Sequence, residues 1–147
     1  MRFVYPVDLA PDEYAEGRPA VLVSFPDLPD AITSGGTREE AVANAIDCLE
    51  AALGWRIKER ADIPEPSPAH GRPTIAPGSL LAQKAALYLA MRQDGVRPTE
   101  LARRMNIKPS QVDRLLDPLH ASKPKQFDAA FAALGRRVVF EVQRVAA

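Results

Sequence analysis

The chain has 147 residues, of which 46% are hydrophobic and 26% charged, a composition typical of a soluble globular protein. It contains no run of about 18 apolar residues, and Cys48 is its single cysteine, so the sequence predicts neither a membrane span nor an internal disulfide. Arg2–Pro6 lack the apolar core of a secretory signal, and we expect a cytoplasmic protein with no membrane partner.

The zero net charge of the whole chain hides an uneven distribution along it. Residues 1–78 carry seven Lys and Arg against thirteen Asp and Glu, whereas residues 79–147 carry twelve against six. Halves of opposite charge predict two domains with different partners. The basic half suits a polyanion, because each neutralised phosphate releases counterions, and the acidic half suits a basic protein.

Alternating apolar residues predict strands at the start of the chain. Phe3–Leu9 and Val21–Phe25 each place apolar side chains on one face. Pro6 has no N–H to donate, which favours an edge position for the first strand. Pro26–Asp30 has the composition of a turn, and Ala31–Thr33 predicts a short third strand after it.

A helix is predicted from Thr37 onward by a capping box. The Thr37 hydroxyl is expected to accept from the Glu40 N–H, while the Glu40 carboxylate accepts from the Thr37 N–H. Apolar residues then recur with the helical period, and this stripe must pack on the sheet: Val42, Ile46, Leu49, Leu53 and Ile57.

A proline-rich stretch divides the chain. Residues 61–78 contain five prolines, a density that prevents a helix and favours extended structure, although Thr74-Ile75 is able to form a brief fourth strand. We therefore predict an N-terminal domain over 1–62, a linker over 63–78 and a C-terminal domain over 79–147. The first domain is an α+β sandwich of order β-β-β-α(-β).

The second domain is predicted to be helical. Ser79 is a good N-cap for a helix marked by Leu80, Lys84, Leu87 and Met91 and ended by Gly95. Pro98 and Pro109 suit the first positions of the next two helices, because proline has no N–H and its φ is already helical. The later elements follow as Thr99–Met105, Ser110–Leu116, Pro124–Leu134 before Gly135, and a strand at 137–143.

The second and third of these helices have the pattern of a helix-turn-helix that binds DNA. Ala102 supplies the small residue that two crossing helices need. Asn106 suits the left-handed turn between them, because asparagine tolerates a positive φ better than any other residue except glycine. Side chains able to contact base edges or phosphates then face outward: Lys108, Ser110, Gln111, Asp113 and Arg114. Ser122 and Lys123 are further candidates for phosphate contacts. The competing interpretation is a four-helix scaffold with a solvated polar face, which the charge distribution disfavours.

The C-terminal strand predicts an oligomer. Val138, Phe140 and Val142 share one face, and an unpaired strand with those residues would be an exposed edge. We expect Val138–Gln143 to pair with its copy in a second subunit, giving a homodimer or a higher even oligomer. The alternative is pairing with Thr74-Ile75 of the same chain.

Three residues of the acidic half are candidates for binding a basic protein. Asp27 and Asp30 lie in the predicted turn and suit such a partner by charge. Trp55 lies about 140° from Val42 around the predicted helix, away from the stripe. It is either left for the partner or covered by the proline-rich segment, which we favour because prolines often lie on aromatic rings. In the favoured case the partner would bind the sheet and its Pro26–Asp30 turn.

An enzymatic function is disfavoured by the polar residues. Asp8 is the only acid in a plausible strand position, whereas two-metal nucleases need several inward carboxylates. His70 and His120 have neither a nearby nucleophile nor metal-ligand spacing. We therefore expect no catalytic residue, metal or cofactor.

Together the two halves resemble the HicB-type antitoxins of bacterial toxin–antitoxin pairs. No single segment is diagnostic, but their order and spacing are, and Asn106 stands where the family usually has Gly. The resemblance rests on Ser24–Pro29, Thr33–Gly35, Thr37–Ala41, Ala52-Leu53, Ile63–Ser67, Lys84–Tyr88, Glu100–Arg104 and Gln111–Asp117.

The resemblance implies a fold and a function. The N-terminal domain would be a truncated ribonuclease H-like domain that masks a small basic toxin of the HicA type, which cuts messenger RNA. The C-terminal domain, of the helix-turn-helix class, would bind operator DNA and repress its own operon. The alternative is a stand-alone transcriptional regulator whose N-terminal domain senses a small ligand.

Overall fold

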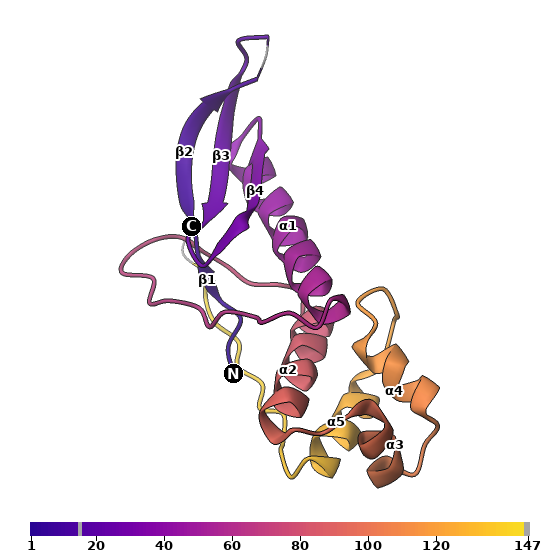
Figure 1. Cartoon of the computed structure of the whole chain (residues 1–147). Helices are drawn as coiled ribbons and strands as arrows, with labels where there is room; N and C mark the ends of the chain where they lie inside the picture. The colour runs from indigo at the N-terminus through magenta and orange to yellow at the C-terminus, as the bar shows by residue number, and fades with distance from the viewer. Residues whose placement is uncertain (15, 146–147) are drawn as a thin grey trace.

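The structure is a computed structural model that describes residues 1–14 and 16–145. It is of the mixed α+β class, as predicted (Figure 1). The strands are Tyr5–Pro6 (β1), Asp8–Glu13 (β2), Pro19–Phe25 (β3), Leu28–Gly35 (β4) and Thr74–Ile75 (β5). The helices are Arg38–Lys58 (α1), Ser79–Asp94 (α2), Pro98–Met105 (α3), Pro109–Leu116 (α4) and Pro124–Ala133 (α5). None of the helices in these described residues combines the length and the apolar character that crossing a membrane requires.

One end of the molecule is an antiparallel sheet of order β2-β3-β4 covered by α1 (Figure 1). The predicted first strand is divided into β1 and β2, which was not foreseen. β1 pairs with β5, the Val7 N–H donates to the Pro73 carbonyl, and β2 pairs with β3 from Asp8 onward. The chain changes partner beside Pro6, which has no N–H with which to continue a ladder.

The predicted turn over Pro26–Asp30 is too long. Only Pro26 and Asp27 form the turn, and β4 begins at Leu28. The Leu28 side chain is fully buried in the core, so it belongs to the strand rather than to a solvated loop. A register irregularity between Ser24 and Phe25 accommodates the tight connection. As a result, Asp30 lies within a strand at the edge of the sheet.

The start of α1 confirms half of the predicted capping box. The Glu40 N–H donates to the Thr37 hydroxyl at 3.1 Å, but the Glu40 carboxylate accepts from the Gly36 N–H and not from Thr37. The carboxylate thus satisfies a donor one residue earlier in the chain. It also stabilises the positive end of the helix dipole.

The buried stripe of α1 is rotated from the predicted one in its first half. Val42 and Ile46 are partly exposed, and the residues that pack on the sheet are Ala41, Ala45, Leu49, Leu53 and Ile57. The cause is a close approach of the helix to β4: a Cβ on Gly35 would lie 2.3 Å from the Ala41 backbone nitrogen. Only small side chains fit at that crossing, so alanines take the inner positions.

The helical end of the molecule shares α2 with the sheet end. Leu81, Ala85 and Tyr88 belong to the core of the sheet and α1. Leu87, Ala90 and Met91 belong to a second core with α3, α4 and α5. Ser79 was predicted as the N-cap of α2, but Gly78 takes that position and donates its N–H to Glu50 instead. A helix that contributes to both cores ties the two halves together mechanically.

The remaining helices agree with the sequence prediction to within a residue at each end. Asn106 ends α3 with φ of 54° and ψ of 45°, the left-handed conformation predicted for it. Gly95 ends α2 in the same region of φ, and so does Gly135, which follows the C-cap Leu134 of α5. Glycine and asparagine with a positive φ mark these helix ends, so the boundaries could be predicted from the local sequence.

The proline-rich residues 63–78 are extended and lie against the N-terminal half. Ile63 and Ile75 are buried in the first core. The Tyr5 hydroxyl donates to the Pro64 carbonyl at 2.8 Å. The division of the chain at 62 and 78 stays a prediction, but this stretch contributes to packing as well as to connection.

Candidate functional site

The exposed face of α4 brings together five of the residues predicted to contact DNA. Leu101 and Ala102 of α3 and Val112 and Leu115 of α4 are buried in the second core. This packing turns the opposite side of α4 outward. The side chains exposed there and at its N-terminus are Lys108, Ser110, Gln111, Asp113 and Arg114.

Gln111 and Arg114 each use one polar group to hold the helix and expose another to the solvent. The Gln111 Oε1 atom accepts from the Lys108 N–H at 3.0 Å, which caps the helix and leaves the Nε2 donors free to contact a ligand. The Arg114 side chain is exposed, whereas its carbonyl points inward and accepts from Lys84 at 3.0 Å. Both side chains therefore project from a helix whose backbone is held from behind.

Ser122 does not belong to this face, contrary to our expectation. It is only 7% exposed, and its hydroxyl contacts the Lys84 ammonium and the His120 ring nitrogen, each at 3.0 Å. A buried hydroxyl with these partners is unable to reach a phosphate. Lys123, which follows it at the N-terminus of α5, is exposed as expected.

The buried position of Lys84 was not foreseen from the sequence. We had counted it with Leu80, Leu87 and Met91 among the residues that mark its helix, and the structure shows it fully buried. The available signal was a lysine at a core position of an amphipathic helix. Long charged side chains are rarely fully buried unless their charged end has specific partners.

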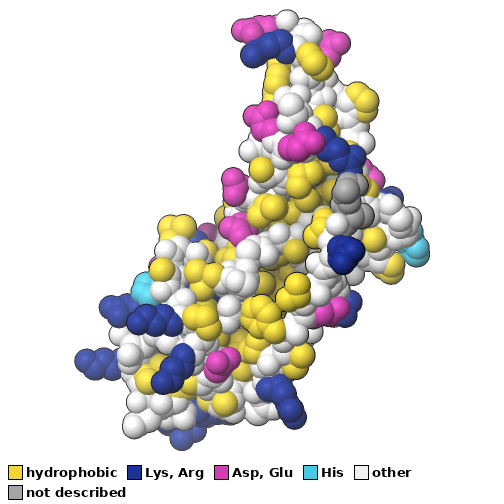
Figure 2. Space-filling model, turned by 180° about the vertical axis from the view of Figure 1, so that it is seen from behind, with side chains coloured by type: hydrophobic (Ala, Val, Ile, Leu, Met, Phe, Trp, Pro, Cys, Tyr) yellow, Lys and Arg dark blue, Asp and Glu magenta, His cyan; other side chains and the backbone are white. Residues whose placement is uncertain are grey.

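The surface charge follows the division seen in the sequence. In the rear view, Lys and Arg gather around the helical end, whereas most Asp and Glu lie over the sheet end (Figure 2). One carboxylate at the helical end is neutralised locally. Glu100 pairs with Arg103 and Arg104, and their hydrogen bonds lower its pKa to about 2. It therefore carries its charge at every physiological pH.

Asp27 and Asp30 are both bound to their own chain. The Asp27 carboxylate accepts from the backbone N–H and the hydroxyl of Ser67. Arg56 donates to Asp30, and this hydrogen bond holds the Asp30 pKa below its ordinary value. The two carboxylates thus anchor the proline-rich segment and the end of α1, and their charge still faces the solvent.

Trp55 is 55% exposed, so our expectation that the proline-rich segment covers it was wrong. That segment follows β1 and the Asp27 turn instead. The Arg56 guanidinium lies 5.8 Å from the centre of the Trp55 ring and also binds Asp30. The Arg56 side chain is only 11% exposed and joins the exposed Trp55 to the exposed Asp30, and we call these three residues the Trp55 face.

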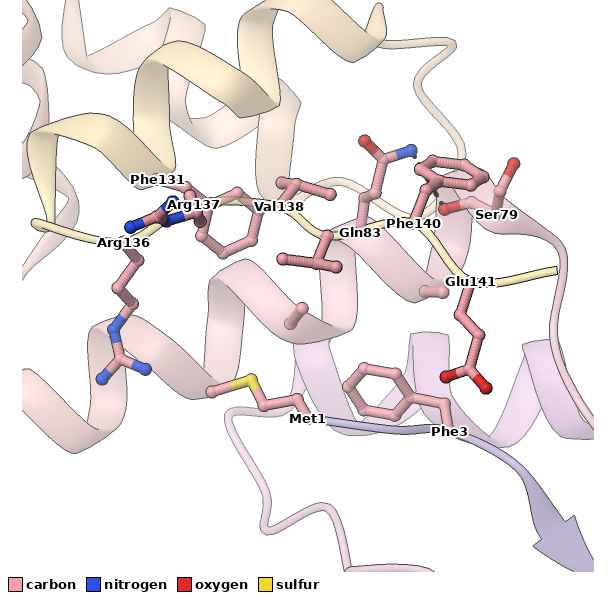
Figure 3. Close-up of a pocket in the computed structure, with 13 residues that line it drawn as sticks. Met1, Phe3, Ser79, Gln83, Phe131, Arg136, Arg137, Val138, Phe140 and Glu141 are labelled. Carbon is pink, nitrogen blue, oxygen red and sulfur yellow. Dashed lines mark hydrogen bonds between the residues drawn. The ribbon is translucent and has the colours of Figure 1, made fainter.

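The predicted strand at 138–143 forms no ladder within the described residues. The alternative pairing with Thr74-Ile75 is wrong, because in the described part of the chain those residues form a two-stranded sheet with β1 alone. The segment is extended and crosses α2 along a groove that Met1 and Phe3 border from the opposite side (Figure 3). Phe140 is 75% exposed and Val142 is 92% exposed, so this segment presents apolar side chains to the solvent.

Comparison with known proteins gives consistent matches. Residues 4–76 match a family described as "HicB_like antitoxin of bacterial toxin-antitoxin system". The chain is 34% identical over 139 residues to Antitoxin HicB 1 of Photorhabdus laumondii, an alignment that covers 95% of this chain and 86% of the relative. It is 35% identical to Antitoxin HicB of Pseudomonas fluorescens, over 84% and 86% of the two chains. For Antitoxin HicB of Escherichia coli K12 the identity is 35%, over 91% and 95%. These alignments extend well beyond residue 76.

Proposed function

The chain belongs to the HicB-like antitoxin family of bacterial toxin–antitoxin systems, and from this we propose that it neutralises a HicA-type toxin and represses its own operon. The observation that carries the proposal is the separation of two surfaces, a basic one at the helical end and a predominantly acidic one at the sheet end. Such a division suits a protein that binds DNA and a basic protein at once. We propose a cytoplasmic, non-enzymatic role, with a truncated ribonuclease H-like domain at the sheet end.

DNA binding is assigned to α3 and α4 as a helix-turn-helix. Three features support this: Ala102 at the crossing, Asn106 in the left-handed turn, and a polar exposed face on the second helix. In such a motif the second helix enters the major groove of DNA. Gln111 and Arg114 are the proposed base contacts, and Lys108, Ser110 and Lys123 the proposed phosphate contacts. Asp113 lies on the same face and disfavours phosphate beside it.

Toxin binding is assigned to the Trp55 face and the neighbouring edge of β4. An exposed Trp beside an Arg is typical of the residues that dominate protein interfaces. β4 is an edge strand of the three-stranded sheet and offers backbone groups for strand addition, although its Ser34 carbonyl already accepts from the Asn44 side chain at 2.9 Å. The negative charge of Asp27 and Asp30 would attract a basic toxin and raise its association rate.

Dimerisation is assigned to the extended C-terminal segment. It presents apolar side chains without a ladder partner in the described part of the chain, and such an edge is normally covered. Two copies pairing through 138–143 would place two α4 helices on one DNA duplex. Repressors of this class commonly recognise two half-sites in this way.

The test of the function uses the neighbouring gene. We expect a small basic protein encoded beside this chain to arrest growth when expressed alone, to be neutralised by co-expression, and to co-purify with this chain. The purified chain should also bind the DNA directly upstream of its coding sequence in preference to a shuffled sequence of equal length. A chain that neither co-purifies with that protein nor prefers the upstream DNA would contradict the proposal.

A further inference from the structure

The helix α4 ends differently from α2 and α3. Those two helices end at Gly95 and Asn106, whose left-handed backbone lets the following N–H groups cap the last carbonyls. Asp117 ends α4 with φ of −76° and ψ of 115°, which is extended backbone. Its N–H still donates to the Arg114 carbonyl at 3.2 Å, but the next residue, Pro118, has no N–H, so the Leu115 carbonyl needs a donor from elsewhere in the fold.

The Lys84 ammonium of α2 donates to the Leu115 carbonyl and adds a second donor to the Arg114 carbonyl. Its Nζ atom lies 3.0 Å from the Arg114 carbonyl oxygen, 3.1 Å from that of Leu115 and 3.0 Å from the Ser122 hydroxyl. Three donors thus meet three acceptors, which satisfies the ammonium fully. A positive charge at this place also lies at the negative end of the α4 dipole.

The Lys84 ammonium has no acidic partner nearby among the described residues. The Nζ atom lies 5.5 Å from the centre of the buried Phe127 ring of α5. Among the described residues no carboxylate comes within 4 Å of it. Burial lowers the pKa of Lys84, and the charge of Asp117 opposes that effect. Two carbonyls and one hydroxyl are therefore what hold the ammonium in the interior.

The orientation of α4 depends on such contacts. The helix has eight residues, and isolated helices of that length are unstable in water, so its position is set by tertiary contacts. Val112 and Leu115 fix which side of the helix faces the core. The contacts of Lys84 fix where its C-terminal end lies relative to α2, which is itself anchored in both cores.

We propose that Lys84 is a positioning residue for DNA recognition, which holds the C-terminal end of α4 so that Arg114 and Gln111 meet the bases in one geometry. This inference rests on the proposed DNA binding. Arg114 links Lys84 to the proposed base contacts, because its carbonyl accepts from Lys84 while its side chain is exposed. Base contacts need accurate geometry, whereas phosphate contacts tolerate displacement of a flexible side chain.

The experiment compares Lys84→Met with a matched control. Methionine has nearly the length and volume of lysine but no donor. Lys58→Met makes the same change at an exposed position of α1. Affinity is measured by fluorescence anisotropy for the DNA upstream of the coding sequence and for a shuffled sequence, at a temperature where circular dichroism shows each variant folded.

The expected result is selective. Lys84→Met should lose at least tenfold in affinity for the upstream DNA and less than threefold for the shuffled DNA, and amide hydrogen exchange should accelerate at the end of α4. Lys58→Met should change neither affinity by more than twofold. A folded Lys84→Met that keeps its affinity for the upstream DNA, or loses equally on both sequences, would overturn the positioning role.

A second variant covers the case in which Lys84→Met does not fold. Ser122→Ala removes one acceptor of the ammonium and the hydroxyl's own 3.3 Å hydrogen bond to the Arg114 carbonyl, and it leaves both contacts between Lys84 and the carbonyls. We expect a threefold or greater loss on the upstream DNA alone, and an unchanged affinity would overturn the inference. Failure of the underlying function is recognised separately: the parent chain would then show no preference for the upstream DNA, and Arg114→Ala would change nothing.

Discussion

Arg56 donates to both carboxylate oxygens of Asp30, with its Nη2 atom 2.7 Å from Oδ1 and its Nη1 atom 3.3 Å from Oδ2. The pair joins α1 to the edge strand β4 across 26 positions of the sequence. The guanidinium also lies over the Trp55 ring, so it organises an aromatic, a positive and a negative group side by side. A surface of this composition would suit a protein partner, because an apolar anchor provides affinity and charge provides selectivity.

The first prediction separates the two parts of this surface. Trp55→Ala should weaken toxin binding by about 2 kcal/mol or more, because truncating a central aromatic anchor is costly in an interface. The double variant Asp27→Lys/Asp30→Lys should slow association more than it speeds dissociation, since exposed charges act mainly on encounter. Surface plasmon resonance with the neighbouring toxin measures both rates.

Asp128→Lys is the control, because it changes an exposed acid of α5 at the opposite end of the molecule. Normal toxin binding by a folded Trp55→Ala protein would move the interface away from the Trp55 face. Circular dichroism checks the fold of each variant.

The second prediction concerns the exposed face of α4. Gln111→Ala and Arg114→Ala should each relax sequence choice at one base position and lower operator affinity by about 1–3 kcal/mol. Lys123→Ala should instead weaken binding to all sequences alike and reduce the salt dependence, because its proposed contact is with phosphate and not with a base. Anisotropy titrations at several salt concentrations distinguish the two patterns. Unchanged operator affinity in the double variant Gln111→Ala/Arg114→Ala would show that α4 is not the reading helix.

The sequence predicted best those elements whose boundaries depend on local chemistry. Pro98 and Pro109 at helix starts, and Asn106 and Gly95 at helix ends, act through their own backbone and need no tertiary information. The stripe of α1 failed at Val42 because a long-range approach between Gly35 and Ala41 decides which side chains fit.

The partners of polar side chains were the least predictable part of the site. Ser122 was assigned to the surface because nothing near it in sequence indicates Lys84, 38 positions earlier. Asp27 likewise meets Ser67 across 40 positions. Trp55 was expected to be covered because prolines often lie on aromatic rings. The expectation failed because the path of the proline-rich segment is set by contacts with Tyr5 and Asp27 and not by its own composition.

The third prediction tests the turn between α3 and α4. Asn106 has a φ of 54°, a conformation that costs most side chains about 1–2 kcal/mol. Asn106→Ala should therefore lower the free energy of unfolding by about 1 kcal/mol, whereas Asn106→Gly should leave it unchanged or slightly higher. Urea unfolding followed by circular dichroism measures the difference. An alanine variant as stable as the parent would mean that the turn relaxes to another conformation.

The fourth prediction concerns alkaline pH. Burial raises the pKa of Tyr5 to about 12, with the charge of Asp27 adding to the effect. A group whose pKa is raised by folding stabilises the protein below its unfolded pKa, near 10, and loses that contribution as the pH approaches 12. The free energy of unfolding of the parent chain should therefore fall between pH 10 and 12.

Tyr5→Phe is the matched variant for this titration. At pH 7 it should be less stable by about 1 kcal/mol, because the hydrogen bond to the Pro64 carbonyl is lost. Above pH 10 the difference between the two proteins should shrink, since phenylalanine has no proton to release. A constant difference from pH 7 to 12 would contradict the raised pKa.

The last prediction concerns the extended C-terminal segment, which is held to its own chain at both ends of its path. Arg136 pairs with Asp94 at 2.9 Å, and Glu141 pairs with Arg2 at 2.8 Å. A chain truncated after Arg137 keeps the first pair and loses residues 138–147. If those residues pair two subunits, the truncated protein should be a monomer in analytical ultracentrifugation, and its operator affinity should fall because one α4 helix replaces two.

Phe140→Asp should have the same effect within the full chain, because a charge on the shared apolar face opposes its burial. Arg144→Ala is the control for a change in this segment that removes no apolar contact. A truncated chain that stays dimeric would place the subunit contact elsewhere and leave Phe140 and Val142 for a different partner.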